Sequence, residues 1–281
     1  MKKRSVFFSL LAAATAVAMP PALADEEGTI LALGDSVAFG YITRAGFQYV
    51  NPDNFVAYPQ YLGVLRHVHT VDAACPGETT GSFLSSIAVD HGCREYRAAS
   101  PLHVSYGSTQ LQFATGYLSL HHNVRVVTVQ LGANDEFVLL DSCASAPNPA
   151  LCVQQGLPAV LQSVATNIGI ILASLRGVGY GGTIVLVNYY SLDYSDPNQT
   201  ALSTLLNQAI SAPAAAYGAI VADVFSTFAA ASAPVGGGKT CFAGLLNVNP
   251  LDTSSCDVHP AQSGHRLIAA TVNSRLPAAE E

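Results

Sequence analysis

The chain has 281 residues, half of them hydrophobic, and carries 12 basic against 19 acidic residues, for a net charge of −7. A surface of this sign without a stripe of Lys and Arg repels phosphate backbones, so nucleic acid is excluded as a partner. The length suits one large domain that buries a full hydrophobic core.

Residues 1–24 have the pattern of a secretory leader that is removed from the mature protein. Its parts are, in order, the basic Lys2-Lys3-Arg4, the apolar residues 6–19 and the small-residue cleavage site Ala22-Leu23-Ala24. The alternative is a membrane anchor, but the apolar stretch is shorter than the ~20 residues that a spanning helix needs. Cleavage leaves nine basic against nineteen acidic residues, a net charge of −10. We therefore expect a secreted, extracellular protein with a single domain over residues 25–281 and no integral membrane segment, because no later window is long and apolar enough.

Apolar runs rich in β-branched residues alternate along the chain with stretches of helical spacing. We expect strands at 29–33, 68–73, 124–131, 183–188 and 219–224, and helices at 58–66, 108–121, 157–176, 199–217 and 261–274. Near-continuous apolar strands alternating with helices predict a three-layer α/β/α sandwich around a parallel sheet. If the strand order is 2-1-3-4-5, ligands bind outside the carboxyl ends of strands 1 and 3. The Ala-, Gly- and Pro-rich segment 228–238 is expected to be a mobile loop.

Six cysteines follow the leader, at positions Cys75, Cys93, Cys143, Cys152, Cys241 and Cys256. An even number in an exported chain favours disulfides, of which fifteen pairings are possible. We favour the local pairing, first with second, third with fourth and fifth with sixth, because each bond closes a short loop. Zinc is the competing interpretation, but there is no Cys-x-x-Cys or His-x-x-x-His pattern. We expect no metal and no cofactor.

Four polar landmarks lie near the ends of predicted strands or in loops. Ser36 follows the first strand and Asn134 the third, while Gly77 and His259 come from loops. Together they supply a nucleophile, oxyanion donors and a base, which serine-dependent acyl transfer requires. Each has an ordinary alternative: Pro-Gly is a common turn, Asn134-Asp135 is a possible helix N-cap, and His259 is a possible surface residue.

Four blocks carry a family resemblance: Gly34-Asp35-Ser36, Gly77, Gly132-Ala133-Asn134-Asp135 and His259-Pro260. In this order they resemble the blocks of the SGNH, or GDSL, hydrolases over almost the entire chain after the leader. The resemblance implies a flavodoxin-like α/β/α fold and ester or thioester hydrolysis through an acyl-enzyme. It makes Ser36 the nucleophile and His259 the base, and it assigns the oxyanion hole to the N–H groups of Ser36 and Gly77 and the amide of Asn134.

The last block departs from the pattern of that family. The usual spacing is Asp-x-x-His, but Cys256 stands three residues before His259 and Asp257 stands two before it. Two interpretations stay open. The carboxylate of Asp257 orients the imidazole, or the backbone carbonyl of Cys256 accepts the Nδ1 hydrogen and stabilises the imidazolium less.

Two competing motifs fail. The sequence before Lys239-Thr240 lacks the first glycine of a phosphate loop, and no Gly-x-Ser-x-Gly elbow of the α/β-hydrolase fold is present.

Substrate signals are few. The apolar run 137–140, beginning at Phe137, follows the Asn134 block, and Tyr189-Tyr190 follow the fourth strand. As lining of an acyl pocket these residues favour fatty acyl esters over acetylated sugars, although the run is equally interpreted as the apolar face of a short helix.

The sequence thus predicts a monomeric, cofactor-independent esterase or lipase whose substrate is a small-molecule or lipid ester. The alternatives are an acyltransferase or carbohydrate deacetylase that uses the same site and, with less support, a non-catalytic binding protein on this fold.

Overall fold

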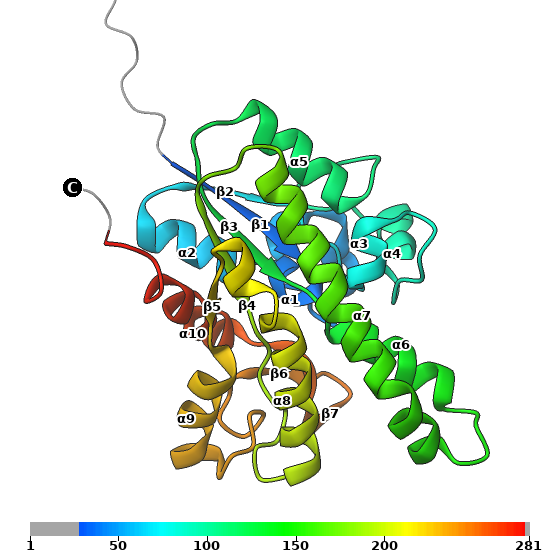
Figure 1. Ribbon diagram of the computed structural model, residues 1–281. Coiled ribbons are helices and arrows are strands. Elements are labelled where there is room, and N and C mark those ends of the chain that lie inside the picture. Colours follow the sequence, from blue (N-terminus) through cyan, green and yellow to red (C-terminus); the bar gives the residue numbers. More distant parts are fainter. Residues whose placement is uncertain (1–27, 279–281) are drawn as a thin grey trace, which may run out of the picture.

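The fold is a three-layer α/β/α sandwich, seen in a computed structural model that describes residues 28–278 (Figure 1). Its centre is a five-stranded parallel sheet in the order β2-β1-β3-β4-β5, which confirms the expected fold class and strand order. The strands are β1 (Thr29–Gly34), β2 (His69–Asp72), β3 (Val124–Gln130), β4 (Thr183–Val187) and β5 (Ile220–Ala222). The predicted leader lies outside the described residues.

Helices cover both faces of the sheet (Figure 1). They are α1 (Ser36–Phe39), α2 (Tyr58–Arg66), α3 (Thr80–Leu84), α4 (Cys93–Ala99), α5 (Gln110–Leu120), α6 (Ala133–Cys143), α7 (Pro149–Gly177), α8 (Pro197–Ser211), α9 (Val224–Gly236) and α10 (Gln262–Asn273). Helix α7 packs against α3, α5, α6 and α8, whereas α10 packs along α2 and α9. These two groups form the outer layers, as right-handed crossovers between parallel strands require.

Strand β1 lies in the middle of the sheet and is buried along its whole length. It pairs with β2 on one side and with β3 on the other, where Gly34 lies opposite Gln130. Parallel strands end at the same edge of a sheet, and polar segments follow both strands there. The residues after β1 and after β3 are thereby brought together.

Two helices differ from the sequence prediction. Segment 228–238, expected to be a mobile loop, belongs to α9, which the Asp223 side chain caps by accepting a hydrogen bond from the N–H of Ser226. Pro234 is tolerated in its last turn, before Gly237 ends the helix in the left-handed conformation. Helix α7 begins eight residues earlier than expected, because Asn148 caps it and Pro149 occupies its first turn.

Helix α7 is, by length and composition alone, apolar enough to cross a bilayer. The expectation that no window after the leader would qualify is therefore wrong. Its buried side chains are Val164, Ile168, Ile171, Leu172 and Leu175, all of which belong to the hydrophobic core. These five residues form the side of α7 that packs on the core, while only 22% of its apolar window is buried.

Three disulfides join Cys75 to Cys93, Cys143 to Cys152 and Cys241 to Cys256, the local pairing that we expected. The second closes the turn between α6 and α7, which project together from the body of the molecule (Figure 1). The third attaches a two-stranded antiparallel ribbon that the sequence analysis did not predict. Its strands are β6 (Leu246–Asn249) and β7 (Asp252–Pro260).

Candidate active site

Ser36 lies directly beyond the carboxyl end of β1, as the first residue of α1. Asp35 caps this helix, because its Oδ1 accepts a hydrogen bond from the N–H of Val37 at 2.9 Å. The chain therefore turns sharply from strand to helix at Ser36. Its hydroxyl is presented at the edge of the sheet, where β1 and β3 both end.

The imidazole of His259 reaches Ser36 from the far end of the chain. Nε2 of His259 lies 3.0 Å from Oγ of Ser36, across a separation of 223 positions. On the other side of the ring, Nδ1 lies 2.7 Å from Oδ1 of Asp257. The three side chains form a continuous hydrogen-bonded series, and the carboxylate of Asp257 is the group in contact with Nδ1.

The carboxylate of Asp257 has further partners. Its Oδ1 accepts the backbone N–H of His259 at 3.1 Å, and its Oδ2 accepts the N–H of Thr43 at 3.2 Å. Burial opposes ionisation of this carboxyl, but the hydrogen bonds and the charge of His259 outweigh it and lower the pKa of Asp257 to about 2. Asp257 is thus ionised at neutral pH and fixes the tautomer in which Nδ1 carries the hydrogen.

Strand β7 explains why the unusual spacing works. Alternate residues of a strand lie on the same face, so Asp257 and His259 point in the same direction. The strand is held from two sides: Cys256 is bonded to Cys241, and the hydroxyl of Tyr190 donates to the carbonyl of Val258 at 2.6 Å. The edge of the Tyr41 ring also packs on the imidazole, with the ring centroids 5.0 Å apart.

A second histidine, His265 of α10, is also buried. Burial, with a smaller contribution from the charge of His259, lowers the pKa of His265 to about 3. It therefore stays neutral, and its Nδ1 has no hydrogen-bond partner among the described residues. The histidine that contacts the serine is His259.

Gly77 lies in the loop after β2, with φ at +83°. A Cβ at this position would lie 2.4 Å from the carbonyl oxygen of His91, so only glycine fits without strain. The carbonyl of Gly77 accepts the N–H of His91 at 2.8 Å. Within residues 28–278, neither the N–H of Gly77 nor that of Ser36 donates to a protein acceptor. Both remain available to an external oxygen atom.

The side-chain amide of Asn134 is already engaged. Nδ2 donates to the carbonyl of Glu78 at 2.9 Å and, over a longer 3.3 Å, to Oδ2 of Asp35. Asn134 is the second residue of α6, whose N-cap is Gly132, so the N-cap interpretation of Asn134-Asp135 is wrong.

Asp35 is the buried carboxyl next to Ser36. Its Oδ2 accepts a hydrogen bond from the hydroxyl of Tyr189 at 2.5 Å. Burial raises the pKa of Asp35 to about 6, although the bonds from Tyr189 and from the N–H of Val37 act against this shift. Asp35 thus connects the start of α1 to the amide of Asn134 and to the chain after β4.

A family model, the GDSL-like lipase/acylhydrolase family, matches residues 32–267. The chain belongs to this family. The match includes Ser36 and His259, and it confirms the resemblance found in the four sequence blocks. As a member of a hydrolase family, the chain has a small-molecule ester as the implied class of substrate.

Solved structures of other enzymes share the fold. A phospholipase A1 from Streptomyces albidoflavus is 19% identical, with a TM-score of 0.57 over 89% of this chain and 100% of the other. An acetyl xylan esterase from Geobacillus stearothermophilus is 13% identical, with a TM-score of 0.55 over 88% of this chain and 93% of the other. No curated protein matches the chain in sequence.

Of the residues expected to line an acyl pocket in this GDSL hydrolase, the two tyrosines lie mainly in the core. Tyr189 and Tyr190 are each only 6% exposed and belong to the core, where Tyr190 stacks on Phe228. Their hydroxyls are used internally, as described above. Phe137 lies on α6, stacked against His91 at 5.6 Å between ring centroids. Both tyrosines are thus largely covered by the core, and their place in an acyl pocket stays a prediction.

Several supporting residues were not found from the sequence. Thr43 acts through its backbone, and Gln110 is the first residue of a helix that begins 74 positions after Ser36 in a different layer. Glu78 directly follows Gly77 in the Cys-Pro-Gly-Glu-Thr block, which is the one signal that pointed to it. Glu78, Cys75 and Cys93 converge like metal ligands, but the two sulfurs are bonded to each other and offer no thiolate.

Proposed function

We propose that the chain is a secreted carboxylic ester hydrolase that works through an acyl-enzyme on Ser36. The observation that carries the proposal is the series of contacts from Ser36 Oγ to His259 Nε2, 3.0 Å, and from His259 Nδ1 to Asp257, 2.7 Å. The predicted leader supports secretion, and three disulfides are compatible with an oxidising compartment.

In this mechanism Ser36 Oγ attacks the ester carbonyl while His259 Nε2 takes the hydroxyl proton. The imidazolium returns this proton to the alcohol as the tetrahedral intermediate collapses to the acyl-enzyme. A water molecule, deprotonated by the same nitrogen, then attacks the acyl carbonyl and frees the acid. Asp257 stabilises the imidazolium in both halves of the cycle and remains ionised.

The oxyanion that forms in each step takes its hydrogen bonds from the N–H groups of Ser36 and Gly77 and from the amide of Asn134. The free state of the two N–H groups supports this assignment. Asn134 joins when the oxyanion outcompetes Asp35 for its second hydrogen. Loss of one such donor typically lowers the rate by about 10²–10³.

Deacetylation of a carbohydrate by the same groups is the second candidate. It gains support because Tyr189 and Tyr190, expected to line a fatty acyl pocket, are buried in the core instead. A series of p-nitrophenyl esters from acetyl to palmitoyl, compared with acetylated xylan, separates the two substrates. Acyl transfer is tested by adding an alcohol acceptor to the same assays.

The proposal is tested by labelling with a fluorophosphonate, which reacts with activated serines. We expect one adduct, on the peptide that contains Ser36, and its loss in Ser36→Ala and His259→Ala. Ser226→Ala, which removes an exposed hydroxyl far along the chain, serves as the control and should label fully. Absence of the adduct in the unaltered protein, together with no turnover of any ester, would establish a binding protein instead.

A further inference from the structure

The loop that carries Gly77 is joined to β1, the strand that precedes Ser36, by two buried polar side chains, Glu78 and Gln110. We propose that these two are positioning residues that hold the oxyanion donors in register with Ser36. The inference rests on the proposed function, since it concerns the geometry of the same site. Neither side chain is expected to touch the substrate.

The side-chain amide of Gln110 pairs with the backbone at the end of β1, as a neighbouring strand would. Gln110 is the first residue of α5 and is fully buried. Its Oε1 accepts the N–H of Gly34 at 2.6 Å, and its Nε2 donates to the carbonyl of Gly34 at 3.0 Å. A side-chain amide thereby pairs with both backbone groups of the residue two positions before Ser36. The remaining hydrogen of Nε2 bonds Oε2 of Glu78 at 3.1 Å.

Glu78 connects this amide to both sources of oxyanion donors. It follows Gly77 directly, and its carbonyl accepts the hydrogen bond from Asn134. Its carboxyl accepts the hydroxyl of Ser82 through Oε1 and the amide of Gln110 through Oε2. Rotation of Glu78 would therefore displace the Gly77 N–H and the Asn134 amide together. Fixing Glu78 to β1 keeps the distances from both donors to Ser36 constant.

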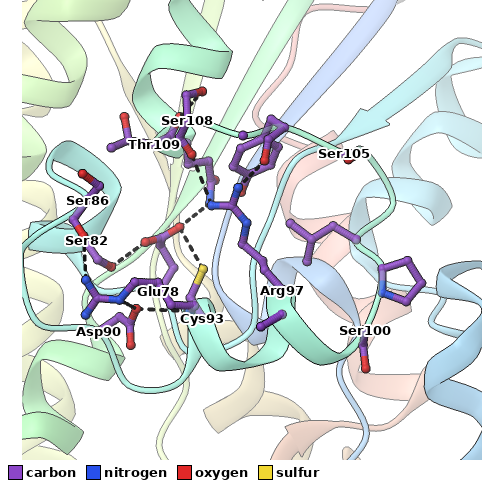
Figure 2. Close-up of a pocket in the computed structure, with 17 residues that line it drawn as sticks. Glu78, Ser82, Ser86, Asp90, Cys93, Arg97, Ser100, Ser105, Ser108 and Thr109 are labelled. Atoms are coloured by element: carbon purple, nitrogen blue, oxygen red, sulfur yellow. Dashed lines mark hydrogen bonds and ion pairs between the residues drawn. The ribbon is translucent and has the colours of Figure 1, made fainter.

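The carboxyl of Glu78 lies at a cavity of about 470 Å³, lined by the end of α3, by α4 and by the loop into α5 (Figure 2). Arg97 and Asp90 line the same cavity, and Arg94 also faces it. Burial raises the pKa of Glu78 to about 7, against the bonds from Ser82 and Gln110 and the attraction of Arg97. Burial thus favours the neutral form of the carboxyl. We therefore attribute the positioning of the loop to the hydrogen bonds of Glu78 and not to its charge.

Other contacts anchor the loop without fixing the orientation of Glu78. Cys75 is bonded to Cys93 before the glycine. After it, Asp135 accepts the N–H and the hydroxyl of Thr80 at 2.8 and 2.6 Å. These anchors lie on both sides of the Gly77-Glu78 peptide. Removal of the Glu78–Gln110 contact should therefore leave a folded protein whose oxyanion donors are displaced.

The test uses Glu78→Met and Gln110→Met, which keep the buried volume but remove the hydrogen bonds, and Glu78→Gln as the conservative variant. The amide of Glu78→Gln can accept from Gln110 and donate to the hydroxyl of Ser82. Fluorophosphonate labelling of Ser36, run to completion, counts the folded sites. Turnover of p-nitrophenyl acetate is then expressed per labelled site, so that a smaller folded fraction does not lower it.

We expect each Met variant to lower kcat per site by about tenfold or more with KM changed less than about threefold, because the donors act on the transition state. Glu78→Gln should stay within about threefold of the unaltered enzyme. The double Met variant should lose little more than the worse single variant, because the two residues act as a unit. Glu95→Gln and Gln155→Ala, on exposed surfaces, should change nothing.

Unchanged kcat per site in both Met variants would overturn the inference, and so would an equal loss in Glu78→Gln. If Glu78→Met does not fold, Ser82→Ala decides, because it removes only the hydroxyl that holds the carboxyl. The same hydroxyl accepts the N–H of Thr79 at 3.0 Å, so the stability of this variant is measured as well. Ser82→Ala must lower kcat per site at constant KM. Failure of the proposed function is distinct, since the unaltered chain would then neither label at Ser36 nor turn over esters.

Discussion

Replacement of Asp257 by Asn removes the negative charge of the side chain but keeps its size and shape, so it tests the contribution of the charge to catalysis. In the structure Oδ1 accepts two N–H groups, both from His259, and Oδ2 accepts the N–H of Thr43. An amide has only one accepting oxygen. In either orientation of the amide, its NH₂ group faces a nitrogen, of Thr43 or of His259, that donates a hydrogen bond to the carboxylate in the unaltered protein.

The side-chain amide of the Asp257→Asn variant has two orientations with different consequences. With oxygen toward His259, the imidazolium loses a charge-assisted bond of roughly 1.5–3 kcal/mol, which corresponds to about 10- to 150-fold in rate. With oxygen toward Thr43, the NH₂ group donates to Nδ1 and places the ring hydrogen on Nε2, which then cannot take the serine proton. In serine proteases this tautomer error lowers kcat by about 10⁴.

We therefore expect Asp257→Asn to lower kcat by about 10–10⁴ while KM changes little. The assay is turnover of p-nitrophenyl acetate with saturating substrate, corrected for the folded fraction by circular dichroism. Asp252→Asn, an exposed position at the start of the same strand, is the matched control. Turnover of Asp257→Asn within about threefold of the unaltered enzyme would refute the role of the carboxylate and return that role to the Cys256 carbonyl.

Three further outcomes are expected. Reduction of the Cys241–Cys256 bond should lower kcat before the sheet unfolds, since β7 carries His259. It should also lower the free energy of unfolding by about 3 kcal/mol, because the bond joins residues 15 positions apart. Full activity after verified cleavage of the bond would contradict the expected loss of kcat. Gly77→Ala should lower kcat by about 10² or more, because the new methyl group meets a backbone carbonyl at a positive φ, whereas Gly107→Ala, where space is open, should keep normal kinetics. Burial raises the pKa of Glu78 from 4.5 to about 7, so the folded state holds the carboxyl proton more tightly than the unfolded state does. The contribution of Glu78 to the free energy of unfolding should therefore fall by up to about 3 kcal/mol as the pH rises from 4.5 to about 7. Denaturant melts at about pH 4.5, 6 and 7.5 should show a shallower decline for Glu78→Gln, and parallel curves would contradict the assignment.

The sheet was predictable because β1, β3 and β4 are near-continuous apolar runs, and Ser36 and Asn134 follow the first two of these. The local disulfide pairing followed from short spacings in the same way. The ribbon that carries His259 was not predicted, since Asp252–Pro260 is polar and half-exposed and lacks an apolar alternation. Once it is a strand, the spacing from Asp257 to His259 places both side chains on one face.

Other features depend on contacts that no local pattern records. Segment 228–238 has few large apolar side chains, but the cap by Asp223 and the burial of Phe228 make it helical. The pairing of Gln110 with Gly34 spans 76 positions, and the bond from Tyr189 to Asp35 spans 154. The sequence placed the tyrosines at the correct end of a strand, but the direction of their side chains was set by packing.

The hydroxyl of Ser36 and the imidazole of His259 are supplied by opposite ends of the polypeptide. A ribosome therefore synthesises Ser36 223 positions before His259. Until the later segment has emerged and folded, the hydroxyl of Ser36 lacks this imidazole as its hydrogen-bond partner.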